Sequence, residues 1–389
     1  MRGFNYGNQD MVVKTLAGLE DMLAQELTDL GATEVKPAVR AVLCKGGLET
    51  LFKINFQTRL AIRVLIPIER FFAQDAQKLY SECKKINWQN YMRKDQTFAI
   101  DAAVSSKYFN HSKFAALKVK DALVDSFRER YGMRPSVDTE RPDVQFSLHI
   151  DQDRIQILMD SSGESLHRRG YRPDGAMAPL SEVLAAAMLK IAWDEKTNLL
   201  NPMCGSGTIA LEAAMMNARV PAQFKRTYFP FLKWENFDRE LWNKVKTEAI
   251  GQIRENTVDV FASDIDPDAV ATAMQNLAST GLKLKIHFEQ RDFFRYGNVR
   301  NHTVIINPPY GERLISEDIG GLYNEMANHL KHAFPGCSAW VISSNLAALK
   351  RFGLKPSRKI TLFNGPLECR YLKFDLYEGS KKINPKHET

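Results

Sequence analysis

The stretch "NLLNPMCGSGTIALEAA" (198–214) predicts a strand, a glycine-rich turn and a helix in immediate succession. Gly205 and Gly207 allow the backbone to approach a ligand closely, and Thr208 begins a helix whose first N–H groups face the same space. The stretch lacks the third glycine of the dinucleotide fingerprint and the G-K-[ST] of a nucleotide phosphate loop. A ligand site is therefore indicated here, with a tight turn that binds nothing as the alternative.

Short apolar segments alternate with helical segments on both sides of this stretch. Beyond the helix predicted over 179–193, the strand candidates are "TNLLN", "VDVFASD", "KIHFEQ", "TVIINPP" and "SAWVISS". Such alternation is typical of a parallel sheet built from βα units. The end of the chain differs, because two strands over 357–365 and 367–377 are joined by Gly365-Pro366. We expect this antiparallel hairpin to close the sheet.

The first 160 residues have a different pattern, with several strands, a helix over 112–131 and a hairpin over 144–160, which predicts an α+β region. The segment 161–176 is rich in Ser, Gly, Arg and Pro and is predicted to be a linker. The segment "YFPFLKWENFDRELW" (228–242) is unusually aromatic and favours local core over a platform for bases. The tail 379–389 is polar.

The amino-acid composition excludes only a few classes of function. The chain has 389 residues, of which 44% are hydrophobic and 25% charged, an ordinary globular balance. A net charge of +7 weakly favours a polyanionic partner. The five cysteines form no C-x-x-C pair, so neither a metal site nor a disulfide framework is expected. No apolar run is long enough to span a membrane and no secretory h-region is present, so we expect a cytoplasmic protein with no membrane partner.

Two further strand ends carry carboxylates. Asp264 stands at the end of the second strand of the parallel sheet, where it could accept both ribose hydroxyls of a nucleoside. Asp266, directly before Pro267, is the better candidate for a helix N-cap. After the third strand, Asp292 could accept from an adenine amine while Phe293 packs against the ring. Since no basic residue lies in the glycine turn, a nucleoside with a small charged tail fits better than a dinucleotide.

The fourth strand runs into Asn307-Pro308-Pro309-Tyr310. The exocyclic amine of a nucleobase is a poor nucleophile because its lone pair is delocalised into the ring. The Asn307 side-chain oxygen and the Pro308 carbonyl could hold its two N–H groups, and these bonds strengthen as the nitrogen gains positive charge. Pro309 stiffens the turn, and Tyr310 offers a stacking face. A base presented in this way is single-stranded or flipped out.

The glycine turn, Asp264, Asp292 and N-P-P-Y resemble the motifs of class I S-adenosylmethionine-dependent methyltransferases acting on exocyclic amines. With "RRGYRP" and "APLSEVLAAAML", they are similar to the THUMP-containing 23S rRNA guanine-N2 methyltransferases, often described as N6-adenine-specific DNA methylases. The resemblance implies S-adenosyl-L-methionine as cofactor and RNA as partner. Position 201, usually aspartate in that family, is Asn201 here, so an amide oxygen would meet the methionine ammonium without a charge.

The resemblance also implies an α/β fold, with a C-terminal Rossmann-like domain whose seven-stranded sheet has its last strand antiparallel. The predicted domains are a ferredoxin-like segment (1–50), a THUMP domain (51–160), the linker (161–176) and the methyltransferase domain (177–378). Residues implied to bind the cofactor are Asn201, Met203, Cys204, Gly205, Gly207, Thr208, Asp264, Ile265, Asp292 and Phe293. Residues predicted to contact RNA are Lys107, Lys113, Lys118, Lys120, Arg168 and Arg169.

Three functions follow from these observations. The leading hypothesis is guanine-N2 methylation of 23S rRNA, by direct transfer and without a metal. An N6-adenine DNA methyltransferase is the second, because both amines present the same two N–H groups to N-P-P-Y. The third is a non-catalytic RNA-binding or ribosome assembly protein. The intact N-P-P-Y argues against this third hypothesis, because a protein without catalysis could lose the motif freely.

Overall fold

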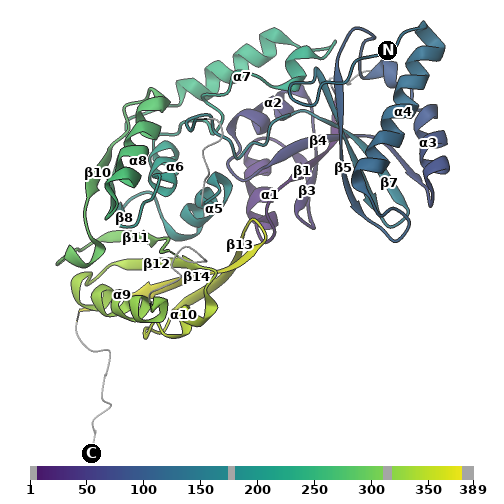
Figure 1. Cartoon of the computed structure of the whole chain (residues 1–389). Helices are drawn as coiled ribbons and strands as arrows, with labels where there is room; N and C mark the ends of the chain where they lie inside the picture. The colour runs from purple at the N-terminus through teal and green to yellow at the C-terminus, as the bar shows by residue number, and fades with distance from the viewer. Residues whose placement is uncertain (1–6, 174–179, 310–317, 379–389) are drawn as a thin grey trace, which may run out of the picture. The chain divides into compact units, whose positions relative to one another are not determined.

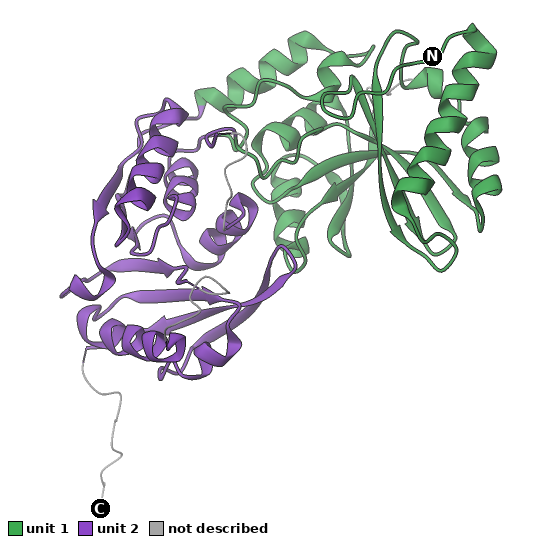
Figure 2. Cartoon of the chain, viewed as in Figure 1, with its two compact units in different colours: residues 1–169, 221–251 green, residues 170–220, 252–389 purple. Residues whose placement is uncertain are grey.

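The computed structural model describes residues 7–173, 180–309 and 318–378 of the chain. These residues form two compact units, each with its own seven-stranded sheet (Figures 1 and 2). The first unit comprises residues 1–169 and 221–251, and the second comprises 170–220 and 252–389. The predicted combination of an α+β region with a Rossmann-like domain is confirmed.

The first unit is built around a mainly antiparallel sheet of strand order β2-β3-β1-β4-β7-β6-β5, in which β5 and β6 pair in parallel. Its strands are β1 (Gln9–Lys14), β2 (Thr33–Ala38), β3 (Ala41–Gly46), β4 (Arg63–Phe72), β5 (Phe98–Ser105), β6 (Val144–Asp151) and β7 (Arg154–Asp160). Its helices are α1 (Glu20–Asp29), α2 (Leu48–Gln57), α3 (Ala76–Lys85), α4 (Ser112–Tyr131) and α7 (Arg239–Gly251), with 3-10 turns at Trp88–Asn90 and Pro230–Lys233. α4 is followed by Gly132, whose φ of 64° is the left-handed conformation that glycine adopts without strain.

The aromatic segment 228–242 belongs to the core of this first unit. The ring of Phe52 in α2 lies 4.8 Å from that of Phe231 and 5.5 Å from that of Trp242, measured between centroids. Phe229 also packs against Trp242 at 5.6 Å. The expectation of local core is confirmed for this segment. Its place differs from the predicted boundaries, which put it inside the methyltransferase domain, because its aromatic side chains pack on α2 rather than on the second sheet.

The first half of the predicted linker is also folded into the first unit. Ser161 and Ser162 are fully buried beside Asn55 of α2. The Asn55 amide donates to Ser161 Oγ at 2.9 Å, and Ser162 Oγ donates back to Asn55 Oδ1 at 2.8 Å. Buried hydrogen bonds among these three side chains hold the chain in one conformation, so Ser161 and Ser162 are not a flexible connection.

The second unit has the strand order β10-β9-β8-β11-β12-β14-β13, with only β14 antiparallel to its neighbours. Its strands are β8 (Asn198–Asn201), β9 (Val260–Asp264), β10 (Ile286–Gln290), β11 (His302–Ile306), β12 (Ser338–Ser343), β13 (Arg358–Asn364) and β14 (Leu367–Asp375). Its helices are α5 (Glu182–Ala192), α6 (Thr208–Asn217), α8 (Pro267–Thr280), α9 (Ile319–Ala333) and α10 (Leu346–Lys350), with a 3-10 turn at Phe293–Arg295.

Helices cover both faces of this second sheet (Figure 1). On one face Tyr371 of β14 donates to the Met188 carbonyl of α5 at 3.3 Å. On the other face Val341 of β12 joins a core cluster with Tyr323 and Met326 of α9. Side chains alternate between the two faces of a strand, so the central strands β11 and β12, which are covered on both faces, are buried almost throughout. The carboxyl ends of β8, β9 and β11 lie side by side at the same end of the sheet. Sheets of this kind bind their ligands at that end.

Candidate functional site

The glycine turn between β8 and α6 has the backbone conformation that its sequence requires. Gly205 and Gly207 have φ of +51° and +79°, a region that favours glycine. A Cβ on Gly207 would lie 2.9 Å from the Cβ of Ala273 in α8, too close for two carbon atoms. A Cβ on Gly205 would meet nothing within 4 Å. Gly207 therefore allows α6 and α8 to pack closely, whereas Gly205 leaves an open space beside the turn.

Asp264 ends β9 next to this turn. One carboxylate oxygen accepts from the Gly205 backbone N–H at 2.9 Å, and the other accepts from the Asp266 N–H at 3.1 Å. Each oxygen of a carboxylate has a second lone pair, so two further donors can be accommodated. The next residue, Ile265, follows the strand and is 65% exposed, which is unusual for a large apolar side chain. This pair can offer acceptors to a diol and an apolar surface to a ring.

The other two acidic residues have local roles that the structure shows directly. Asp266 is the N-cap of α8 and accepts from the Asp268 N–H at 2.9 Å, as predicted. Asp292 accepts from the Phe294 N–H at 3.0 Å and so caps the short turn after β10. The ring of Phe293 is 3% exposed and stacks on Phe334 at 5.8 Å. The predicted stacking of this ring on an adenine is wrong, because the hydrophobic core already covers it.

Asn201 and Asn307 bring two buried acceptor oxygens to neighbouring strands. Asn201, at the end of β8, is fully buried, and its amide donates to the Ile305 carbonyl of β11 at 2.9 Å. Its Oδ1 is buried and has no hydrogen-bond partner among the described residues. Asn307 lies two residues beyond Ile305, and its Oδ1 is likewise buried without a partner among residues 7–173, 180–309 and 318–378, while Pro308 is buried beside it. Buried acceptors are normally satisfied, so these two oxygens indicate a place for a ligand's donors.

The remaining predicted cofactor residues frame this space. Met203 packs against the core cluster of the second sheet, and the backbone N–H of Cys204 donates to the Ser263 carbonyl at 2.9 Å. Burial raises the pKa of the Cys204 thiol to about 12, so the thiol stays protonated. This cysteine therefore contributes packing to the site and is not a nucleophile. Pro309 is exposed, whereas Tyr310 lies outside the described residues.

Arg172 is a residue of this site that the sequence reasoning missed. Its guanidinium lies 3.2 Å from a carboxylate oxygen of Glu182 in α5, and it also donates to Thr208 Oγ1 at the start of α6. The largely buried Arg172 guanidinium therefore lies beside the glycine turn, next to the positive end of α6. Because a cation is unfavourable there, the carboxylate of Glu182 balances its charge. The composition of residues 161–176 predicts a linker, and it contains no signal for the ion pair between Arg172 and Glu182.

The donor and acceptor set fits the nucleoside cofactor that the sequence implied. Asp264 would accept from the ribose hydroxyls, Ile265 would cover the base, and Asn201 Oδ1 would accept from the ammonium of the methionine tail. Open space at Gly205 allows the backbone to approach that tail. S-adenosylmethionine, when bound, supplies an electrophilic methyl group on a sulfonium.

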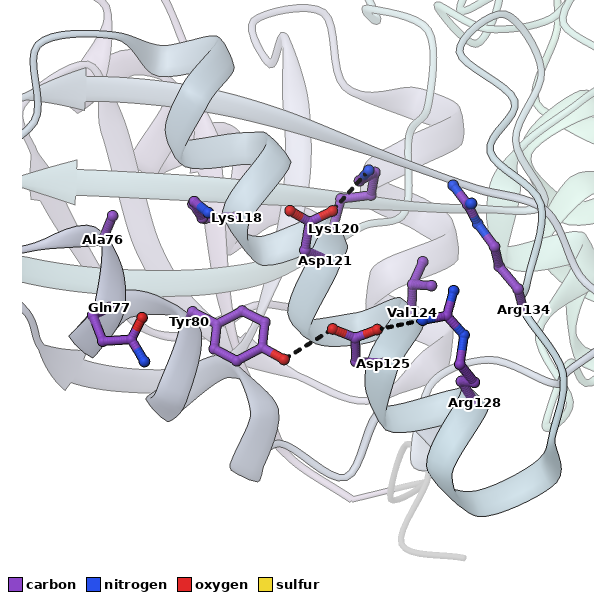
Figure 3. Close-up of a pocket in the computed structure, with 10 residues that line it drawn as sticks. All are labelled: Ala76, Gln77, Tyr80, Lys118, Lys120, Asp121, Val124, Asp125, Arg128 and Arg134. Carbon is purple, nitrogen blue, oxygen red and sulfur yellow. Dashed lines mark hydrogen bonds and ion pairs between the residues drawn. The ribbon is translucent and has the colours of Figure 1, made fainter.

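The predicted RNA-contact residues fall into two groups. Lys107, in the loop before α4, and Lys113, in the first turn of α4, are exposed. Lys118 and Lys120 line a hollow of about 420 Å³ beside α3 and α4 (Figure 3). These four remain candidates for contacts with phosphates. Arg168 is exposed and paired with Glu164.

Arg169 requires a correction. It is 2% exposed, and its guanidinium donates to the backbone carbonyls of Leu166 and Arg59 at 2.6 and 2.8 Å. The prediction that Arg169 contacts RNA is therefore wrong. A basic residue in a Ser/Gly/Arg-rich segment was expected to be solvated, but this one ties that segment to the end of α2.

We expect Arg169→Gln to destabilise the protein, because two buried carbonyls would lose a charged donor. The expected loss is about 2–4 kcal/mol in the free energy of unfolding of the first unit, measured by chemical denaturation. Arg168→Gln, one residue earlier and exposed, is the matched control and should change stability by less than about 0.5 kcal/mol. Equal effects of the two variants would contradict the structural role of Arg169.

Among residues 7–173, 180–309 and 318–378, no helix is long and apolar enough to cross a membrane. The same described residues contain no group of three His, Cys, Asp or Glu side chains arranged to hold a metal ion.

A parallel sheet ending in an antiparallel hairpin, with a glycine turn, an acidic strand end and an Asn-Pro-Pro strand end, defines a class I S-adenosylmethionine-dependent methyltransferase. Residues 169–373 match the model of the RMKL-like methyltransferase domain. The chain belongs to this family. Residues 73–160 match the THUMP domain, and residues 10–65 match the RlmL ferredoxin-like domain.

Relatives of known name are similar over most of this chain. A protein of Synechocystis sp. named as an RNA methyltransferase, slr0064, is 41% identical over 92% of this chain and 95% of its own length. The ribosomal RNA large subunit methyltransferase K/L of Syntrophotalea carbinolica is 40% identical over 93% of this chain. That alignment covers 53% of the relative, so the chain spans about half the length of the K/L protein.

Two solved structures have the same fold throughout. The structure of SMU.472, a methyltransferase complexed with SAH, is 28% identical, with a TM-score of 0.85 over 96% of this chain and 99% of that one. A predicted N6-adenine-specific DNA methylase from Listeria monocytogenes is 26% identical, with a TM-score of 0.84 over 96% of this chain and 97% of that one.

Proposed function

We propose that this protein methylates the exocyclic N2 amine of a guanine in 23S rRNA, in the cytoplasm. The observation that carries the proposal is the Oδ1 atom of Asn307, which is buried at the carboxyl end of β11 and has no hydrogen-bond partner in the described part of the chain. An amine donor placed there would satisfy it. Asn201, whose side chain is bonded to β11 two residues before Asn307, provides the second free acceptor on the cofactor side.

The chemistry follows from what these residues can hold. Asn307 Oδ1 and the Pro308 carbonyl accept the two N–H groups of the target amine and turn its lone pair out of conjugation. The amine nitrogen then forms a bond to the methyl carbon, the methyl–sulfur bond breaks, and its electron pair stays on sulfur. Both acceptors stabilise the positive nitrogen in the transition state before it releases a proton. No covalent enzyme intermediate is needed.

The first unit supports the choice of RNA as substrate. Lys118, Lys120, Arg128 and Arg134 line the hollow beside α3 and α4, together with Asp121 and Asp125 (Figure 3). Two of these cations are paired, Lys120 with Asp121 at 2.8 Å and Arg128 with Asp125 at 3.1 Å. The lining therefore has an excess of positive charge that suits a phosphate of the RNA backbone.

The names of the relatives support ribosomal RNA, and the resemblance of N-P-P-Y and its flanking residues supports guanine. The test is methyl transfer by the full chain to unmodified large-subunit rRNA and, separately, to DNA, followed by nucleoside analysis. N2-methylguanosine in rRNA is the expected product. N6-methyladenine in DNA would support the function in the name of the Listeria structure, and no product in either would support a non-catalytic role.

A further inference from the structure

The second unit carries opposite charges at the two edges of its sheet. Residues 346–375, from α10 through β13 and β14, contain seven Lys or Arg and two Asp or Glu. Residues 255–292, around β9 and β10 at the opposite edge, contain three Lys or Arg and seven Asp or Glu. The acidic half includes Asp264 and Asp292, which the sequence predicts to bind the cofactor. A polyanion approaching Asn307 is therefore repelled from the β10 side and attracted to the β13 side.

Most of the cations between α10 and β13 are free to bind an anion. Five of the ten residues from 350 to 359 are Lys or Arg, and none is acidic. Arg351 is paired with Asp318 at 2.9 Å. The other four are exposed and have no carboxylate within ion-pair distance among the described residues; these are Lys350, Lys355, Arg358 and Lys359, which we call the α10–β13 cations.

The strand register connects this edge directly to the proposed reaction centre. Ile306, the residue before Asn307, pairs with Val341 of β12, Val341 pairs with Leu372 of β14, and Leu372 pairs with Lys359 of β13. Lys359 thus lies three strands away from Ile306 at the same level of the sheet. At about 4.8 Å between strands, this is about 14 Å. A stacked nucleic-acid strand rises about 3.4 Å per nucleotide, so the distance corresponds to about four nucleotides.

We propose that the α10–β13 cations bind the phosphates of the RNA strand flanking the target nucleotide. The flanking strand crosses the sheet from β11 towards the β13 edge while the target base is held at Asn307. This inference rests on the proposed function and adds a second RNA-binding surface, on the catalytic unit itself. It assigns these residues to substrate binding and not to the chemical step.

Protection of an exposed sheet edge is an alternative explanation for these cations, but it accounts only for those on β13. Lysines on an edge strand prevent pairing with another chain, and β13 is such an edge. Preventing such pairing does not require free cations on α10 or in the loop that follows it. It also does not require the opposite edge of the sheet to be acidic. β10 is also an edge strand, and residues 286–290 contain no lysine.

The test compares two double variants of the full chain that change net charge equally. K355Q/K359Q removes two α10–β13 cations, and K283Q/K285Q removes two exposed lysines from the β10 edge. The measurements are kcat and KM for methyl transfer to large-subunit rRNA at several salt concentrations, with S-adenosylmethionine affinity by calorimetry. K355Q/K359Q should raise the KM for RNA about tenfold and reduce the slope of log KM against log salt by about 1.4. Cofactor affinity and kcat should stay unchanged.

The control arms separate the two proposals. Wild-type protein that methylates neither rRNA nor any fragment of it would overturn the proposed function. Active wild type with equal KM values for K355Q/K359Q and K283Q/K285Q would overturn only the present inference. A tenfold effect of K355Q/K359Q on full-length rRNA that disappears on a substrate trimmed to the nucleotides next to the target would support it further.

Discussion

Replacing Asn307 with alanine is expected to lower kcat for methyl transfer about 100- to 1000-fold. The side-chain oxygen is one of two acceptors proposed to hold the amine, and its bond strengthens only as the nitrogen becomes positive. Losing one preorganised polar group of this kind typically costs a factor of that size. Because Oδ1 has no partner among the residues that the structure describes, its removal breaks no hydrogen bond of that atom within them. The protein should therefore fold normally and bind S-adenosylmethionine with nearly unchanged affinity.

The control for this prediction is Asn307→Asp, which keeps an acceptor oxygen at the same distance from the backbone. It should retain clearly more activity than Asn307→Ala. Thermal unfolding and calorimetric titration of the cofactor on both variants separate chemistry from folding and from cofactor binding. If Asn307→Ala lost cofactor binding in step with activity, Asn307 would belong to the cofactor site and the assignment of its role would be wrong.

The arrangement of the second unit followed from local signals in the sequence. Apolar runs such as "TVIINPP" end where polar residues or prolines begin, and they alternate with helical segments. The helix start at Thr208 and the N-cap at Asp266 were also predictable, because each depends on residues within one turn of the chain. Since carboxyl ends of parallel strands meet at one edge, the approximate position of the site followed from the same pattern.

Features that depend on distant partners were not predictable. The aromatic segment 228–242 packs on Phe52, nearly two hundred residues earlier, and nothing in its own sequence names that partner. Arg169 and Arg172 share one basic segment, yet one is bonded to backbone carbonyls of the first unit and the other to Glu182 in the second. Phe293 was assigned to the ligand because it follows Asp292, but only the packing of Phe334 shows that its ring is in the core.

The packing of the aromatic segment 228–242 on Phe52 also determines which variants can test the first unit. Deleting residues 1–160 would remove Phe52 and expose Phe229, Phe231 and Trp242, which pack together in the first unit. Loss of activity in such a truncation would then reflect exposed apolar surface as much as lost RNA binding. Substitutions of exposed side chains on the intact chain, such as Lys107 and Lys113, are the sharper probe of the first unit.

The second large effect is expected for Asp264→Ala, which should weaken S-adenosylmethionine binding at least about 100-fold. Two hydrogen bonds from the ribose to a charged acceptor would be lost, each worth about 1.5–3 kcal/mol. The Gly205 N–H would also lose its partner at 2.9 Å, so the glycine turn would be held less firmly. Calorimetric titration of the cofactor measures the change directly.

Asp266→Ala is the matched control, because it removes a carboxylate only two residues away. Asp266 caps α8 through the Asp268 N–H, so its loss should cost about 1 kcal/mol of unfolding free energy and leave cofactor affinity nearly unchanged. Asp264→Asn, which keeps one carbonyl oxygen and the shape of the side chain, should fall between wild type and Asp264→Ala. A similar loss of affinity in Asp266→Ala would show that a general reduction of negative charge, rather than contact with the ribose, explains the effect of Asp264.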